Sequence, residues 1–259
     1  MDRRARPGGA AGQVLPRTIR SKKASFEMNF TPDGPSAIPM WVNGHAFLTV
    51  HDAFFDVTNP VSGEVVRRVP LCGAAEAAEA VAAARGAQPA WAEMGLQARR
   101  VCLAGLAEAL ERYAGHFAKL LSQETGAEEV ATTAEVAAAI AALRGMAVGD
   151  TGVFGLVLDA ERPLAAFAEA MAPALLAGAT LVVKPSPKAP GAVYALCELS
   201  ARAEWPAGVL NLLQGDSAAL EGLCAAGIDR LVYRGHPALG EQVGKLAEAA
   251  AVTFVAQTH

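Results

Sequence analysis

The stretch TGVFGLVLDAERPLAAFAEAMAPALLAGATLVVKPS, residues 151–186, decides the fold of this chain. Its apolar run at residues 153–158 is typical of a strand that is buried on both faces. Pro163 can begin a helix, because its missing N–H is one of the donors that lack a partner there. The β-forming residues 180–183 then lead to Lys184. The stretch is therefore a βαβ unit, with Lys184 at the carboxyl edge of the sheet, where ligands of open parallel sheets bind.

The alternation of strand and helix continues downstream of this unit. Further strands are predicted at residues 209–213, 231–233 and 252–255, and helices at residues 191–203, 218–225 and 239–250. Together with residues 153–158 and 181–183, this pattern has five strands separated by helices. The predicted class is α/β, a doubly wound, mostly parallel Rossmann-like sheet with helices on both faces.

A different pattern precedes the βαβ unit. The alternation of apolar and polar residues over 38–69 predicts a short antiparallel β segment. Ala-rich helices follow as far as residue 143, and the first is predicted at residues 75–85, with Gly86 and Pro89 as breaks. The acidic residues of these helices, Glu135 among them, are interpreted as solvated helix faces rather than paired catalytic carboxylates.

Composition and charge exclude several classes of function. The 259 residues are 53% hydrophobic and 19% charged, which is enough apolar sequence for a full core without disulfides. The net charge of −4 gives no reason to expect a nucleic acid partner, and no apolar run is long enough to span a membrane. The four cysteines have no CxxC spacing, so neither a disulfide framework nor a metal site is predicted. Free thiols fit a reducing compartment, and a cytoplasmic protein is expected.

Several motifs resemble the coenzyme-binding region of the aldehyde dehydrogenase superfamily. The sequence Lys184-Pro185-Ser186 is similar to the Lys-Pro-Ser motif of that family. Further similar segments are NPVSGE at residues 59–64, QETG at 123–126, PAGVLN at 206–211 and GD at 215–216. Because the motifs extend over most of the chain after residue 40, it is identified as a member of this superfamily, similar to its coenzyme-binding part.

The resemblance implies a dinucleotide cofactor, NAD or NADP. In the family the lysine of the motif lies along the adenosine ribose, and Lys184 is the matching residue. The cofactor-binding residues implied by the resemblance are Lys184, Pro185, Ser186, Gly215, Arg234, Gly235 and His236. Pro187 follows this motif where the family often has a glutamate that holds the ribose hydroxyls, and a proline side chain can accept no hydrogen bond.

The segment YRGHPALG, residues 233–240, is similar to the family's Phe-Thr-Gly-Ser-x-x-x-Gly motif. In the family, the serine and the N-terminus of the following helix hold the pyrophosphate. Gly235 matches the first glycine of the motif and so preserves the course of the backbone. Pro237 removes a backbone N–H donor. Arg234 or a protonated His236 could compensate as a cation, and Arg234 as the cap of a surface loop is an equal alternative.

Other departures from the family pattern concern catalysis. Glu161 stands where the family has an oxyanion-stabilising asparagine, and a carboxylate there would repel developing negative charge. Val255 replaces the general-base glutamate, and the family's nucleophilic cysteine belongs to a segment beyond residue 259. Residues 143–152 also lack the family's longer linking segment, which contains a hairpin used in oligomerisation. No catalytic residue and no metal ligand are therefore predicted.

These features predict a truncated and degenerate relative that lacks the catalytic cysteine domain. Such a pseudoenzyme would be non-catalytic alone and would act by binding NAD(P) or a partner, either a second copy or a full-length aldehyde dehydrogenase. The alternative is an NAD(P)-dependent aldehyde dehydrogenase whose catalytic part is supplied by another chain. A hydrolase triad of Ser217, Asp229 and His236 is disfavoured, because Ala219 stands where the nucleophile elbow needs a glycine.

Two regions are expected along the chain. Residues 1–37 are predicted to be a disordered basic leader, since the first 27 residues contain seven basic and two acidic side chains. An organelle transit peptide, a small contact with an anionic surface and a start codon read too far upstream are the alternatives for this leader. Residues 38–259 are predicted to form the aldehyde-dehydrogenase-like NAD(P)-binding domain, with a helical and β preface at 38–150 and the βα core at 151–259.

Overall fold

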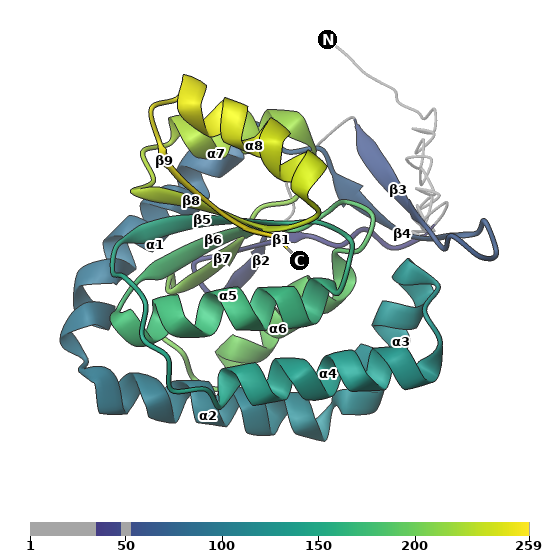
Figure 1. The fold of residues 1–259 in the computed structure, drawn as a ribbon, viewed down its shortest axis with the longest axis horizontal. Coiled ribbons are helices and arrows are strands. Elements are labelled where there is room, and N and C mark those ends of the chain that lie inside the picture. Colours follow the sequence, from purple (N-terminus) through teal and green to yellow (C-terminus); the bar gives the residue numbers. More distant parts are fainter. Residues whose placement is uncertain (1–34, 48–52, 259) are drawn as a thin grey trace, which may run out of the picture. The chain divides into compact units, whose positions relative to one another are not determined.

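A seven-stranded sheet is the central element of the computed structural model, which describes residues 35–47 and 53–258 (Figure 1). The strand order is β2-β1-β7-β6-β5-β8-β9, and β3 and β4 form a separate two-stranded sheet. The strands are β1 (Met40–Val42), β2 (His45–Phe47), β3 (Phe54–Thr58), β4 (Val65–Pro70), β5 (Val153–Leu158), β6 (Thr180–Lys184), β7 (Leu210–Leu212), β8 (Arg230–Gly235) and β9 (Thr253–Thr258). Strands β7, β6, β5, β8 and β9 are parallel, which confirms the predicted α/β class. Residues 1–34 of the predicted leader lie outside the described residues.

The predicted antiparallel β segment has two parts. Strands β3 and β4 pair with each other, whereas β1 and β2 extend the main sheet. β1 is antiparallel to β7, with Trp41 opposite Leu212. All three residues of β1 are buried, and this burial against the main sheet stabilises the pairing.

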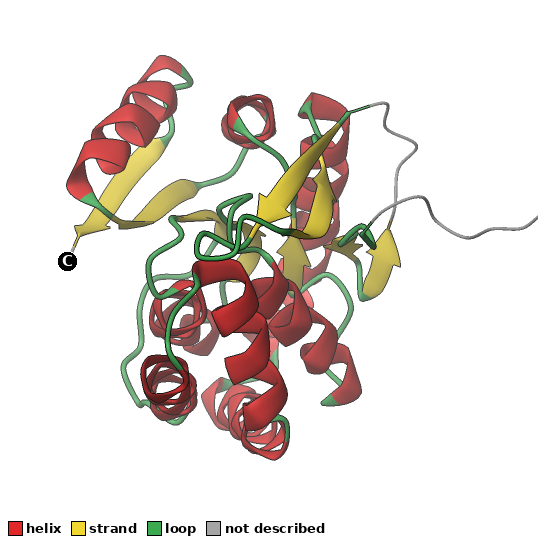
Figure 2. Cartoon of the chain, turned by 90° about the vertical axis from the view of Figure 1, so that its right-hand side faces the viewer, coloured by secondary structure: helices red, strands yellow, loops and turns green. Residues whose placement is uncertain are grey.

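Helices cover both faces of the main sheet (Figures 1 and 2). They are α1 (Ala74–Glu93), α2 (Leu96–Arg112), α3 (Ala114–Thr125), α4 (Glu129–Leu143), α5 (Pro163–Ala177), α6 (Gly191–Arg202), α7 (Ser217–Ala225) and α8 (Pro237–Ala249). Side chains of α1, α7 and α8 form one core cluster with the sheet, and side chains of α2 to α6 form another on the opposite face. The chain therefore has the layered architecture of a doubly wound protein.

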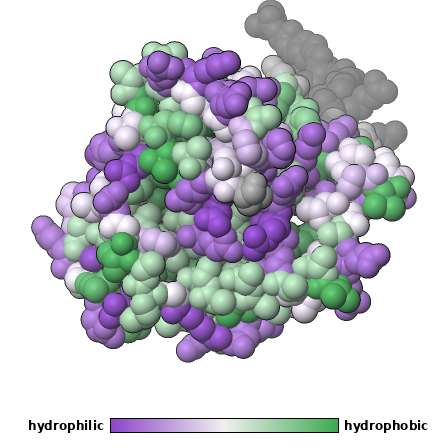
Figure 3. Space-filling view, in the orientation of Figure 1, coloured by the Kyte–Doolittle hydropathy of each residue, from purple (hydrophilic) through white to green (hydrophobic). Residues whose placement is uncertain are grey.

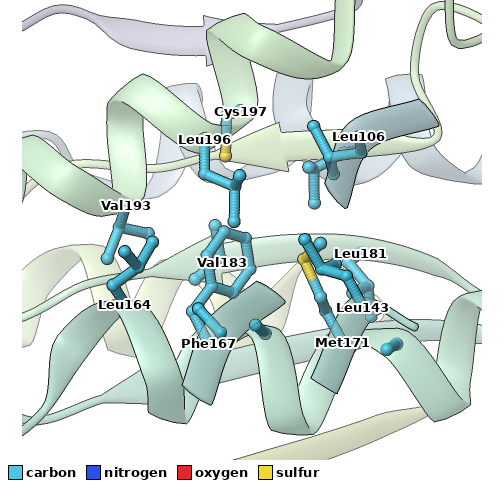
Figure 4. Close-up of a cluster of buried hydrophobic side chains, with 14 of the residues drawn as sticks. Leu106, Leu143, Leu164, Phe167, Met171, Leu181, Val183, Val193, Leu196 and Cys197 are labelled. Carbon is cyan, nitrogen blue, oxygen red and sulfur yellow. The ribbon is translucent and has the colours of Figure 1, made fainter. Parts of the chain in front are cut away.

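The core beneath α5 shows why its sequence pattern predicted a helix. Leu164, Phe167 and Met171 recur at helical spacing and are fully buried. They meet Val183 of β6 and Leu196 of α6 (Figure 4). Each fully buried apolar side chain of this size contributes roughly 1.5 to 3 kcal/mol.

Helix α1 is longer than predicted. The sequence pattern predicted that it ends at residue 85, but the helix continues through Gly86 and Pro89 to Glu93. Trp91 in the added turns is 1% exposed, and its indole donates a hydrogen bond to the Leu175 carbonyl at 3.1 Å. Tertiary burial therefore outweighs the local cost of a proline in the helix.

The surface of the described residues is mixed in polarity. Figure 3 shows a pale green band across the lower part of the face in view, where α4 lies in Figure 1, because this helix is rich in alanine. In the described ranges, no helix is long and apolar enough to cross a membrane. No group of three or more histidine, cysteine, aspartate or glutamate side chains suited to a metal ion occurs there either.

Candidate functional site

Four helices begin at the carboxyl edge of the parallel strands. α5, α6, α7 and α8 follow β5, β6, β7 and β8, respectively. The loops between each strand and its helix therefore meet at one edge of the sheet, which is where open α/β sheets bind ligands. The backbone N–H groups in the first turn of each helix are potential donors to an anion.

A cavity of about 220 Å³ opens at this edge beside Lys184. Its walls are mostly apolar and come from β5, α7 and α8. The lining residues are Val157, Leu158, Lys184, Ser186, Pro187, Asp216, Ser217, Leu220, Leu239, Gln242, Val243 and Leu246. Lys184 and Ser186, both predicted to bind the cofactor, thus line the same cavity. Asp216 lines it too, although the sequence indicated it only as part of the GD motif.

Lys184 ends β6 and is only 6% exposed. Its ammonium donates a hydrogen bond to the Pro185 carbonyl at 3.1 Å. Burial lowers the pKa of Lys184 to about 8, and the nearby Asp216 carboxylate acts in the opposite direction. A lysine ammonium has three donors, so donors remain for a ligand in the cavity.

Gly215 lies beside this cavity, but it is needed for packing of the chain itself. Its φ of +121° lies in a region that favours glycine. A Cβ atom there would lie 2.9 Å from the Ala219 Cβ and 3.0 Å from the Cys72 N. The structure therefore explains this glycine without a ligand.

The turn before α8 is filled by a carboxylate. Asp159, at the end of β5, is 6% exposed and accepts hydrogen bonds from the N–H groups of His236 at 2.7 Å and Glu161 at 2.9 Å. A Cβ atom on Gly235 would lie 2.3 Å from the Asp159 Cγ. Because Gly235 has no side chain, the Asp159 carboxylate has room to pack against the Gly235 backbone.

The two predicted cations near α8 have partners within the chain. Arg234 pairs with the Glu169 carboxylate and donates to the Gln257 side chain at 3.1 Å. The Nδ1 atom of His236 accepts a hydrogen bond from the Ala238 N–H at 3.2 Å. This bond requires an unprotonated Nδ1, so a protonated His236 would have to break it.

Two further carboxylates lie at helix starts, and neither contact was predicted from the sequence. Glu135 of α4 accepts from the N–H groups of Leu164 at 2.9 Å and Ala165 at 3.3 Å, at the start of α5. Burial raises the pKa of Glu135, so its interpretation as a solvated helix face was wrong. Glu124 accepts from the Gly191 N–H at 2.8 Å at the start of α6, and burial raises its pKa to about 7. Neither contact has a local sequence signal, since it joins residues 29 to 67 positions apart.

The parallel sheet, its two helical layers and the cavity at the carboxyl edge define a doubly wound protein of the nucleotide-binding class. The model of the aldehyde dehydrogenase family matches residues 47–149 and 150–257. The chain belongs to this family. The two matched segments adjoin inside the connection between α4 and β5, where the resemblance implied a longer linking segment.

Similar proteins are aldehyde dehydrogenases about twice as long as this chain. The N-succinylglutamate 5-semialdehyde dehydrogenase of Escherichia coli is 32% identical over 79% of this chain and 46% of its own length. The glutarate-semialdehyde dehydrogenase of Pseudomonas putida is 29% identical over 78% of this chain and 48% of its own length. The chain thus spans about half the length of the curated relatives it matches.

Solved structures of the family have the same fold. The lactaldehyde dehydrogenase of Escherichia coli superimposes with a TM-score of 0.81 at 25% identity, covering 87% of this chain and 52% of the other. PnpE in complex with nicotinamide adenine dinucleotide superimposes with a TM-score of 0.78 at 25% identity, covering 85% and 50%. In the present chain, Lys184 has donors left for the hydroxyl groups of such a cofactor. The start of α8 does not fit its diphosphate, because the His236 and Ala238 N–H groups already have acceptors.

Proposed function

We propose that this chain is a non-catalytic member of the aldehyde dehydrogenase family that binds a nucleoside of the kind found at the adenosine end of NAD and NADP. The observation that carries the proposal is the Lys184 cavity, in which a buried ammonium with spare donors faces apolar walls at the carboxyl edge. The ribose hydroxyls of the ligand would accept from Lys184. Ser186 and Asp216, which line the same cavity, would complete the polar contacts.

The acidic groups around the start of α5 support a non-catalytic role. Glu161 and Glu135 line a second cavity, of about 600 Å³, on the side where the resemblance places the oxyanion-stabilising asparagine. Negative charge at this position opposes an oxyanion. Val255, in β9, holds the position of the family's general base and cannot accept a proton.

The cysteines of the chain support the same conclusion. Cys72, Cys197 and Cys224 are buried, Cys102 is half-buried, and none of the four lines the Lys184 cavity. Burial raises the pKa of Cys102 and Cys224, which lowers the fraction of reactive thiolate. Lone protein is therefore expected to form no NADH from short or aromatic aldehydes, and aldehyde oxidation that thiol alkylation abolishes would contradict this role.

Isothermal titration calorimetry with NAD, NADP and adenosine tests the binding role. Lys184→Met is expected to weaken binding roughly tenfold or more, since a hydrogen bond to a charged group contributes about 1.5 to 3 kcal/mol. Lys188→Met is the matched control, because Lys188 is exposed and lies outside the lining of the cavity. Absence of saturable binding by all three ligands would refute the proposal.

Partner binding is a second candidate function, and the edge strand β9 favours it. Within the described sheet, β9 is terminal and pairs with β8 alone, so the backbone groups on its other side can pair with another strand. The partner would be a second copy or a full-length aldehyde dehydrogenase. A partner that supplied the cysteine and the glutamate would make the pair an NAD(P)-dependent aldehyde dehydrogenase.

Light scattering after size-exclusion chromatography tests the partner role. The chain is expected to elute as a dimer, or to co-elute with an added full-length relative. NADH formation by the mixture, above that of the relative alone, would support catalysis in trans. A chain that elutes as a monomer, both alone and with the added relative, would refute partner binding as the second candidate function.

A further inference from the structure

All four helix starts at the carboxyl edge already hold an acceptor from the chain itself. Glu135 occupies the first turn of α5, and Glu124 occupies that of α6. Asp216 accepts from the Ala218 N–H at 3.1 Å in α7. Asp159 and the His236 ring occupy the turn that leads into α8. At each start, at least one N–H group at the positive end of the helix dipole, which would attract a phosphate, thus donates to an internal side chain.

At the start of α8, side chains of the protein accept the hydrogen bonds that a phosphate would otherwise accept. Pro237, its first residue, has no N–H. The His236 N–H donates to Asp159 Oδ2, and the Ala238 N–H donates to His236 Nδ1. The Asp159 side chain is 94% buried and packs against the Gly235 backbone, so it cannot swing away without leaving a hole. A diphosphate would have to displace this carboxylate to reach the donors.

This filled turn neighbours the Lys184 cavity along the chain. Leu158 lines the cavity and directly precedes Asp159, and Leu239 lines it within the first turn of α8. A second carboxylate, Asp216, lies in the cavity wall itself. Lys184 is the one cation among the lining residues, all of which belong to the described part of the chain. A ligand that binds beside Lys184 therefore meets one positive charge, and the buried Asp159 carboxylate directly follows a residue of the cavity wall.

We infer that this cavity selects a neutral nucleoside, of the adenosine type, over the same nucleoside carrying a 5′-diphosphate. The inference rests on the proposed function, whose binding site it makes more specific. Like charges repel most where burial keeps water away, and Asp159 is such a charge. The cavity of about 220 Å³ lies below the range of about 300 to 1,000 Å³ that is typical of sites for drug-sized ligands, so it suits one nucleoside rather than a dinucleotide.

Calorimetric titration of the full chain with adenosine and with ADP tests the inference. Wild-type protein is expected to bind adenosine at least as tightly as ADP. Asp159→Asn keeps the size of the side chain and removes its charge, so the ratio of the ADP to the adenosine dissociation constant should fall roughly tenfold. Asp56→Asn is the control, because Asp56 is an exposed aspartate of β3 and its removal changes the net charge equally.

The possible results separate the inference from the proposed function. If wild-type protein binds ADP tenfold more tightly than adenosine, or if Asp159→Asn leaves the ratio unchanged, the inference is overturned and the adenosine site stands. If neither ligand binds, the proposed function fails. Should Asp159→Asn not fold, the ratio measured for wild-type protein still decides the question.

Discussion

The carboxyl edge of the sheet has two halves that are built from the same elements but are occupied differently. In one half, Lys184 and Asp216 line a cavity whose other walls come from β5, α7 and α8. In the other half, at the turn between β8 and α8, Asp159 fills the space and accepts from the His236 N–H. A helix start at the edge of a parallel sheet therefore does not define a phosphate site by itself. The site exists only where the N–H donors lack an acceptor within the chain.

The half that Asp159 fills stabilises the folded chain and does not contribute to ligand affinity. A carboxylate that accepts from backbone N–H groups makes hydrogen bonds that are roughly twice as strong as neutral ones. Asp159 and Glu135 each accept two such bonds. Substitutions that disturb the packing of the filled half, or that change its charge, test this difference between the two halves through the free energy of unfolding.

The largest effect is expected for Gly235→Ala, which breaks the filled half directly. Its Cβ would lie 2.3 Å from the Asp159 Cγ, and φ at this residue is +149°. Overpacking and backbone strain together should lower the free energy of unfolding by about 4 kcal/mol, measured by urea denaturation.

Gly227→Ala is the control for this substitution. Gly227 has a φ of +83° and no atom within 4 Å of the added Cβ. Only the strain of a left-handed residue remains, so a loss of about 1 kcal/mol is expected. An equal loss in the two variants would show that Asp159 does not pack against Gly235 as described.

A smaller effect is expected for Glu124→Gln, and it depends on pH. Burial raises the pKa of Glu124 from 4.5 to about 7 in the folded chain, so folding favours the protonated acid. The stability from this group is fully present below pH 4.5 and is lost as the pH rises through 7. Between pH 5 and pH 8, wild-type protein should lose roughly 2 to 3 kcal/mol relative to Glu124→Gln in urea denaturation.

The exposed Glu129→Gln is the control for the pH series. It should follow the wild-type curve within about 0.5 kcal/mol, because surface substitutions have small effects. If wild-type protein and Glu124→Gln have parallel pH profiles, Glu124 is ionised in the folded chain at pH 5. The start of α6 would then hold a charged carboxylate over the whole range.

The smallest effect is expected for Glu135→Ala. Its carboxylate caps α5, whose own cap residue, Arg162, makes no side-chain hydrogen bond to the N–H groups of the first turn. Loss of the cap should cost about 1 kcal/mol of unfolding free energy. Glu79→Ala, on an exposed face of α1, should change stability much less, and equal effects would argue against capping by Glu135.

The sequence predicted the fold most accurately where the pattern is local. The run at residues 153–158 matches β5 at both ends, and Lys184 lies at the carboxyl end of β6, as predicted. Helix α1 was predicted too short, because Pro89 suggested a break that the burial of Trp91 overrides. Periodicity and turn residues indicate such elements because they depend on neighbours in the chain.

The sequence by itself determined the parallel α/β sheet, the family and the place of Lys184 at its carboxyl edge. Only the tertiary structure decided which side chains occupy the helix starts at this edge. Asp159 meets His236 across 77 residues of chain, and Glu135 meets Leu164 across 29. Such hydrogen bonds depend on the packing of elements that are distant in the chain. The periodicity of the sequence therefore does not predict them. The charge that faces a ligand at this edge is therefore a property of the folded chain.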